Sequence, residues 1–235
     1  MDSQLLTAKI LKLQDKDGCW NVLSETDKYY PEYNYYVPSY SSTLWTLILL
    51  ADAQTDSNNE LLHPPLKIIT NHFYDPYHKI FTIGKSHFPI PCLNGNMIYL
   101  LSYFKYDPHN YIDNVVNFFT QYQRFDDGDF LSTKMYPYKG NRSCYSNHTC
   151  YWGVVKLLKG LSFIPRDQRS KNAKILMQRC IDFILLHEVC FSSHNKEEYL
   201  HSYMEKLTFP NLYRSDFLEV LWLLKREEVC CEPIQ

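Results

Sequence analysis

The chain has 235 residues, a formal net charge of −2 and no block of basic residues. This balance argues against nucleic acid or an anionic membrane as the main partner, because both are bound through clustered lysine and arginine side chains. A chain of this length buries a sizeable core and needs neither a metal nor disulfides simply to fold. No linker rich in Gly, Ser or Pro divides it, so we expect one domain over residues 1–235.

The N-terminus lacks a basic segment followed by an apolar one, and the longest apolar run, residues 47–51, is too short to cross a bilayer. We therefore expect a soluble, cytoplasmic protein without a transmembrane segment. Of the eight cysteines, Cys180 falls in an apolar helical stripe, and Cys230 and Cys231 are adjacent. Without a secretory context, reduced thiols are expected in place of disulfides.

The spacing of apolar residues predicts eight helices of two alternating kinds. The more polar helices are expected at residues 5–13, 61–73, 110–122 and 168–186, and the helices that are apolar on most sides at 41–54, 91–104, 150–164 and 215–225. No stretch keeps the period of a β-strand long enough to form a sheet. The sequence thus predicts an all-α fold.

This alternation is typical of helical hairpins stacked side by side, with the apolar helices inside and the amphipathic ones outside. Four such inner–outer pairs are expected. If consecutive hairpins curl in one direction, the inner helices are parallel and their N-termini lie at one common rim.

The helix before Pro165 is the most apolar one. Cys150, Val154 and Leu161 share one stripe with two further leucines, and Lys156 and Lys159 are the residues expected to resist burial. We expect Ser146 to cap its first turn, and Pro165 to end it.

The residues before this helix have the side chains that bind zinc. Cys144, His148 and Cys150 lie within seven residues, and the common rim adds Cys92 from the start of a neighbouring helix. A helix N-terminus also favours thiolates. These four residues are the candidate ligands for Zn²⁺. The alternative is that Cys92 and Cys150 are buried as small apolar residues and that His148 is a hydrogen-bonding group.

Two turns share a pattern of glutamine, Asp-Gly and an aromatic residue. They are Gln14…Asp17-Gly18-Cys19-Trp20 and Gln123…Asp127-Gly128-Asp129-Phe130. The pattern resembles the QW-type repeats of terpenoid cyclases. The stretch Asn147-His148-Thr149-Cys150-Tyr151, followed by Gly160-Leu161-Ser162, is similar to the zinc-histidine stretch of protein prenyltransferase β subunits. Segments at 92–96, 185–189, 207–210 and 215–219 look like small prokaryotic squalene-cyclase-like proteins of unestablished function.

The resemblance implies an α/α toroid, here with about four hairpins where full barrels of these families have roughly six. It also implies a zinc site in which His148 matches the family's histidine and Cys92 its cysteine. Ile90 stands where the family has its aspartate. The acidic motif of class II cyclases is absent, because Asp126-Asp127-Gly128-Asp129 has a different order and belongs to a turn.

Aromatic residues on the inner segments are candidates for lining a cavity that holds an isoprenoid chain. The candidate substrate-binding residues are Tyr40, Trp45, Tyr99, Tyr103, Tyr151, Trp152, Trp222 and, as an acidic group at the rim, Asp216. The alternative is that the rings fill a helical core and that Asp216 serves as a helix-start carboxylate. His187, His194 and the pair Asp126-Asp127 are expected to be capping or surface groups.

The leading expectation for function is therefore a prenyltransferase-like or terpenoid-cyclase-like protein that binds an isoprenoid diphosphate or another apolar small molecule. A rim of parallel helix N-termini favours an anionic head group, and aromatic walls below favour an apolar tail. The rival expectation is a noncatalytic helical-repeat module that binds a protein partner. An empty aromatic centre would favour the first, and a filled core the second.

Overall fold

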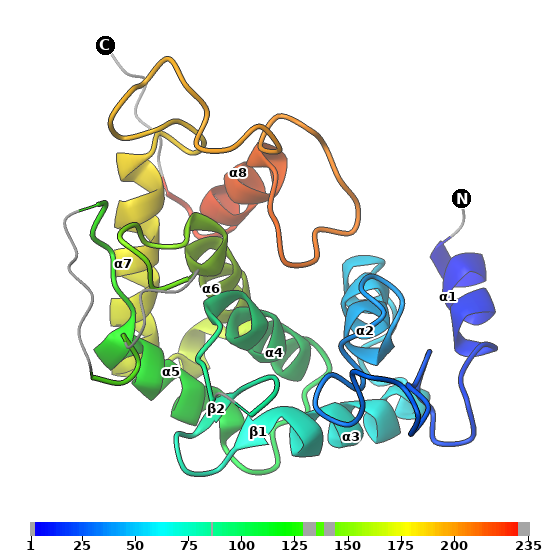
Figure 1. The fold of residues 1–235 in the computed structure, drawn as a ribbon. Coiled ribbons are helices and arrows are strands. Elements are labelled where there is room, and N and C mark those ends of the chain that lie inside the picture. Colours follow the sequence, from blue (N-terminus) through cyan, green and yellow to red (C-terminus); the bar gives the residue numbers. More distant parts are fainter. Residues whose placement is uncertain (1–2, 86, 129–134, 139–143, 230–235) are drawn as a thin grey trace.

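The computed structural model describes residues 3–85, 87–128, 135–138 and 144–229 (Figure 1). Its α-helices are α1 (Ser3–Leu11), α2 (Thr43–Asp52), α3 (His63–Phe73), α4 (Pro91–Tyr103), α5 (Tyr111–Tyr122), α6 (Tyr151–Phe163), α7 (Lys171–Leu186) and α8 (Phe217–Arg226). Short 3₁₀ turns span Glu60–Leu62 and Arg166–Gln168. The prediction of a mostly helical chain is confirmed, with each helix near its expected position.

Two short strands were not expected. β1 (Tyr74–Asp75) and β2 (Ile80–Phe81) form an antiparallel hairpin in which Tyr74 pairs with Phe81 and Asp75 with Ile80. Asn94 of α4 holds this hairpin, because its side chain accepts from the Phe81 N–H and donates to the Phe81 carbonyl, both at 2.8 Å. Strands of two residues carry no detectable period, which is why the sequence pattern missed them.

The helices lie in two sets. α2, α4, α6 and α8 are in contact one after another, while α3, α5 and α7 pack outside the helices that precede them (Figure 1). The inner helices run in the same direction, since the α4–α6 contacts pass in order from Pro91 and Gly153 to Tyr99 and Phe163. α2 has the same direction, because Trp45 near its start contacts Tyr213 just before α8 and Asp52 at its end bonds Tyr99 and Lys159. α8 runs parallel to α6, since their contacts pass in order from Lys156 and Glu219 to Phe163 and Trp222. The parallel inner helices expected from the alternation are thus present.

α4 and α6 touch backbone to backbone. A Cβ atom on Gly95 would lie 2.3 Å from the carbonyl carbon of Lys156, and one on Gly160 would lie 2.5 Å from the carbonyl oxygen of Gly95. These are below any ordinary contact distance, so only glycine permits this packing. The space between these two inner helices is therefore filled by their own backbones.

Lys156 and Lys159 correct one expectation. Both are buried, with exposed fractions of 0% and 4%, although the pattern placed them in solvent. Lys156 Nζ lies 2.7 Å from Glu219 Oε2, and Lys159 Nζ lies 3.0 Å from Glu219 Oε1 and 2.8 Å from Asp52 Oδ1. Carboxylates from α8 and α2 thus neutralise both cations inside the core.

Two other local expectations have clear outcomes. The prediction that Ser146 caps α6 is wrong, because α6 begins at Tyr151 and Cys150 occupies the N-cap position. The Asp216 carboxylate does cap α8, where Oδ1 accepts from the Glu219 N–H at 2.9 Å. Trp20 of the first glutamine turn is buried, and its indole N–H donates to the Ile10 carbonyl at 2.9 Å. Phe130 of the second glutamine turn, and Cys230 and Cys231, lie outside the described residues.

The described helices include none with the length and apolar character needed to cross a membrane. No disulfide joins the cysteines in the part of the chain that the structure describes, and Cys19 and Cys180 are buried.

Candidate functional site

Asp127, His148 and His194 gather just before the N-terminal end of α6. The backbones of Asp127 and His148 form an antiparallel bridge, and His148 Nδ1 lies 3.1 Å from Asp127 Oδ1. His194 Nε2 approaches the other oxygen, Oδ2, at 3.5 Å. Gly128 permits this approach, because its φ is +105° and a Cβ there would be 3.0 Å from the His148 ring. One carboxylate therefore faces two imidazoles, each on its own oxygen.

The two imidazoles are open to solvent, whereas the carboxylate is not. The side chains of His148 and His194 are 60% and 65% exposed, and that of Asp127 is 16% exposed. The ring centroids of the two histidines are 5.9 Å apart. An ion held here would keep coordination positions that face water.

His187 and Ser193 support Asp127 from the protein side. The Ser193 hydroxyl donates to Asp127 Oδ2. His187 Nδ1 contacts the Phe191 carbonyl at 3.1 Å, and a carbonyl can only accept, so we infer that Nδ1 carries the proton. Burial lowers the pKa of His187, which favours the neutral ring.

The neutral form of His187 leaves its Nε2 as an acceptor, 3.9 Å from Asp127 Oδ2. Two acceptors thus face each other beside the two exposed imidazoles. A cation stabilises such an arrangement, and nitrogen with carboxylate oxygen is a donor set that suits Zn²⁺.

The predicted zinc ligands do not meet at one point. Among the described residues, each group of side chains close enough to share an ion consists of aspartate and histidine, and His148 belongs to one of them. Cys144 and Cys150 instead form a thiol pair, with Cys92 nearby. The structure therefore separates His148 from the three cysteines.

Cys150 is the thiol with the most anionic character in this group. Hydrogen bonding with Cys144 lowers its pKa to about 7, aided by the Gly153 and Trp152 backbone N–H groups and opposed by burial. Burial raises the pKa of Cys92 to about 12. The Cys150 thiol therefore loses its proton more readily than the Cys92 thiol.

Three of the predicted ring residues gather around Tyr213 and Arg214. The ring of Tyr213 lies 6.3 Å from that of Tyr40 and 6.2 Å from that of Trp45. The Arg214 guanidinium lies 4.2 Å from the Tyr203 ring centroid, 5.2 Å from that of Tyr213 and 5.4 Å from that of Trp152. We call this set, which is Tyr40, Trp45, Trp152, Tyr203, Tyr213 and Arg214, the ring cluster.

The ring cluster belongs to the end where the inner helices begin. Trp45 and Trp152 are in the first turns of α2 and α6, and Arg214 precedes α8. The Nε atom of Arg214 is buried and has no hydrogen-bond partner among the described residues. Sequence reasoning missed Arg214 and Tyr213, because a single Tyr-Arg pair in a loop has no periodic or motif signal.

The other predicted ring residues lie elsewhere. Tyr99 and Tyr103 pack on each other and on Phe163, which in turn contacts Trp222. Tyr99 is 2% exposed and donates to Asp52, and Tyr103 donates to the Thr55 carbonyl. Tyr99 is therefore a core residue near the C-terminal end of α4, whereas Trp222 is 45% exposed.

Tyr151 and Asp216 also have structural partners. Tyr151 faces the outer helix α7, where its ring contacts those of Phe183 and His187. Asp216 accepts from the Thr208 N–H in addition to capping α8. Neither belongs to the ring cluster.

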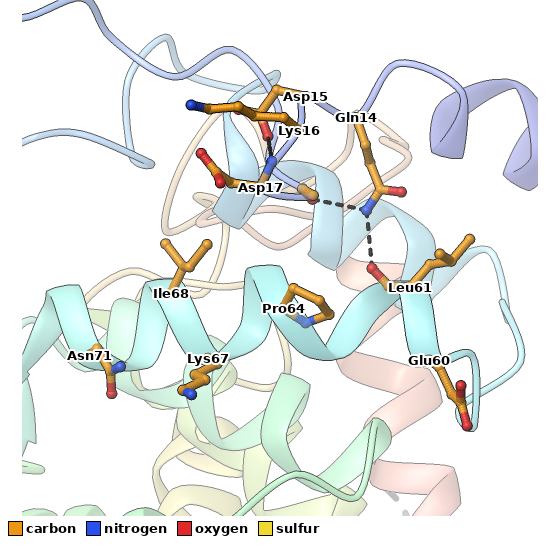
Figure 2. A pocket seen from close by; sticks show the side chains of 11 residues that line it. Gln14, Asp15, Lys16, Asp17, Glu60, Leu61, Pro64, Lys67, Ile68 and Asn71 are labelled. Carbon is orange, nitrogen blue, oxygen red and sulfur yellow. Dashed lines mark hydrogen bonds between the residues drawn. The ribbon is translucent and has the colours of Figure 1, made fainter.

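A groove of about 800 Å³ lies between the loop at residues 14–18 and α3 (Figure 2). The Gln14 side chain links the two sides at one end of the groove, because its Nε2 donates to the Gly18 and Leu61 carbonyls at 2.8 and 3.1 Å. Its charged residues, Asp15, Lys16, Asp17, Glu60 and Lys67, are of mixed sign. They include no histidine or cysteine, so the groove lacks the donors of the Asp127 group.

No protein-family model, no curated protein and no solved structure matches the chain.

Proposed function

We propose that the chain binds Zn²⁺ through Asp127, His148 and His194, in an α/α toroid that acts on an isoprenoid diphosphate or a similar apolar substrate. Asp127 carries the proposal, because two exposed imidazoles and the buried acceptor of His187 converge on its carboxylate. Tetrahedral zinc with bonds of about 2.0–2.1 Å places neighbouring ligand atoms roughly 3.3–3.4 Å apart. His148 Nδ1 and His194 Nε2 lie 3.1 and 3.5 Å from different oxygens of Asp127, and the three side chains offer ligand atoms that are all within 4.8 Å of one another.

Two histidines and one carboxylate leave zinc an open position, as in catalytic sites. When bound, such an ion supplies a Lewis acid that activates a water molecule or holds a thiolate. The chain's own part is to fix the carboxylate, through the Ser193 hydroxyl, and to keep the imidazoles accessible to solvent.

The toroid part of the proposal is supported by the alternation of inner and outer helices. α2, α4, α6 and α8 run parallel inside, and each of α3, α5 and α7 follows one of the first three outside. Four parallel inner helices bring their N-termini toward one rim, where anions are favoured.

The ligand part is supported by the ring cluster. The Arg214 guanidinium hydrogen-bonds Tyr203, but its Nε has no partner among the residues that the structure describes. Tyr40 and Tyr203 beside it are 59% and 41% exposed. An anionic head with an apolar tail matches a guanidinium set among aromatic faces. Cys150, whose pKa is lowered by hydrogen bonding with Cys144, is the N-cap residue of α6, in which Trp152 occupies the first turn.

Zinc content tests the metal proposal. In protein prepared without a histidine tag, this group should account for about one zinc per chain, so His148→Ala and His194→Ala should each lower the zinc content by about one ion per chain, because each deletes one of three ligands. His109→Ala is the matched control, since His109 is an exposed histidine outside the group. Cys150→Ala should leave the zinc content unchanged. Loss of zinc in Cys150→Ala but not in His194→Ala would replace this site by the cysteine-containing set expected from the sequence.

Calorimetry with farnesyl or geranylgeranyl diphosphate tests the ligand proposal. We expect saturable binding that is weakened about tenfold or more by Arg214→Gln and by Trp152→Ala, since each removes a contact to one part of the ligand. Tyr103→Phe is the control, because its hydroxyl bonds Thr55 away from the ring cluster. Absence of binding by well-folded protein at concentrations up to about 1 mM would favour the rival function, a module that binds a protein partner.

A further inference from the structure

A second carboxylate, that of Asp75, also has two imidazoles close to it, and these residues are distant in the sequence from the Asp127 group. His78 Nδ1 and His87 Nδ1 both lie 2.7 Å from the same oxygen, Asp75 Oδ2. These three ligand-type atoms are all within 4.8 Å of one another. None of the three residues was singled out by the sequence pattern, because their spacing matches no motif.

Asp75 is held rigidly in place. It closes strand β1, where the Asp75–Ile80 pairing and the Asn94 clamp on Phe81 fix the hairpin against α4 (Figure 1). Its other oxygen, Oδ1, accepts from the Tyr77 N–H at 2.9 Å and the His78 N–H at 3.3 Å. Oδ1 is therefore occupied by the backbone, and Oδ2 is the oxygen left for the imidazoles.

Tyr136 completes the surroundings. Its ring stacks on His78 with centroids 4.3 Å apart, and its hydroxyl donates to the His87 carbonyl at 3.0 Å. The Asp75 side chain is 5% exposed, whereas those of His78 and His87 are 23% and 57% exposed. A buried, fixed carboxylate thus faces two imidazoles that retain room to move.

We infer that Asp75, His78 and His87 form a second binding site, for a divalent transition-metal ion such as Zn²⁺ or Co²⁺. Both Nδ1 atoms aim at one oxygen, so deprotonated Nδ1 atoms would direct their lone pairs into one small space with Oδ2. When the ion binds, each neutral imidazole carries its single ring proton on Nε2 and not on Nδ1. The ion then occupies the space between the two Nδ1 atoms and Oδ2 that the N–H protons filled before.

The required adjustment is small. Nitrogen–oxygen distances of 2.7 Å widen toward roughly 3.3 Å, the separation that bonds of about 2.0–2.1 Å demand in a tetrahedral site. The more exposed His87 ring can make most of this movement. Two nitrogens and one oxygen suit zinc and cobalt better than calcium or magnesium, which prefer oxygen alone.

Cobalt titration tests this inference independently of the Asp127 site. The protein is prepared as a His148→Ala/His194→Ala double variant, which removes the first group, and Co²⁺ is added while visible d–d absorption is recorded. One Co²⁺ per chain is expected. His78→Ala and His87→Ala, each added to this background, should weaken binding by about a hundredfold, as loss of one of three ligands does.

His109→Ala in the same background is the control and should bind like the parent. Asp75→Asn is a further variant that keeps the size of the side chain and should also weaken cobalt binding. Far-ultraviolet circular dichroism verifies that each variant is folded. Unchanged cobalt affinity in folded His78→Ala and His87→Ala would overturn the inference and leave the cluster as two hydrogen bonds to Asp75.

Discussion

Removing the Glu219 carboxylate should destabilise the protein more than any other change in the buried charge network. Glu219 is the carboxylate shared by both buried lysines, with Nζ–Oε distances of 2.7 Å to Lys156 and 3.0 Å to Lys159. In Glu219→Ala, Lys159 keeps Asp52, whereas the partner that remains for Lys156 among the described residues is the Asn211 carbonyl, at 2.9 Å. Leaving a buried charge without its partner costs about 3–5 kcal/mol, which is a large part of a stability of about 5–15 kcal/mol.

Two further variants serve as comparisons for the loss of unfolding free energy expected in Glu219→Ala. Asp52→Ala leaves Lys159 on Glu219, so the expected loss is smaller, about 1–3 kcal/mol. Glu197→Ala changes an exposed glutamate and should stay within about 0.5 kcal/mol of the parent. The free energy of unfolding is measured by urea denaturation, and the slope with urea should be the same in all variants.

The dependence on pH provides a second measurement on Glu219→Ala. Burial already lowers the pKa of Lys156, and Glu219 opposes that effect, so removing Glu219 lowers the pKa further in the folded state. The unfolded chain then binds more protons than the folded chain at pH values between the folded pKa and about 10.4. Stability of the variant must therefore rise with pH relative to the parent. A loss below about 1 kcal/mol, or a loss that does not shrink as the pH rises, would refute this account of the network.

Three further outcomes are expected. Gly95→Ala should lower the free energy of unfolding by at least about 1–3 kcal/mol despite the better helix propensity of alanine, because the new Cβ would lie 2.3 Å from the Lys156 backbone. A midpoint of thermal unfolding equal to or above that of the parent would contradict this. Burial lowers the pKa of His72, so its contribution to stability is full above about pH 6.5 and is lost as the pH falls below that value. In His72→Gln, the free energy of unfolding should therefore change less between pH 5 and 7 than in the parent. An equally steep loss of stability toward acid in this variant would contradict the role given to His72. In protein freed of metal by a chelator, the rate at which iodoacetamide alkylates Cys150 should rise with pH through a midpoint near the Cys150 pKa of about 7. Cys180, whose pKa is raised by burial, should stay unmodified. Mass spectrometry that finds Cys180 modified before Cys150 would contradict this prediction.

The sequence alone determined the helices and their two kinds. Apolar spacing over ten or more residues predicted α2, α4 and α6 as buried helices, because burial on most sides leaves a local signature that needs no knowledge of partners. The same prediction is wrong for α8, which is buried on one face only and exposes Leu218, Leu221 and Trp222. The Asp216 cap could also be predicted, since a cap bonds within one turn of its own helix. The short β1–β2 hairpin left no such trace.

Only the tertiary structure decided where charged and chemically active side chains lie. Lys156 and Lys159 were expected in solvent, and they are buried because Asp52 and Glu219 come from helices 107 and 60 positions away from Lys159. His148 was expected beside cysteines, yet its ring meets Asp127, 21 positions earlier, and His194. The energy of a charge or a metal ligand depends on partners that reach it from distant segments, and local periodicity contains no information about which segments those are.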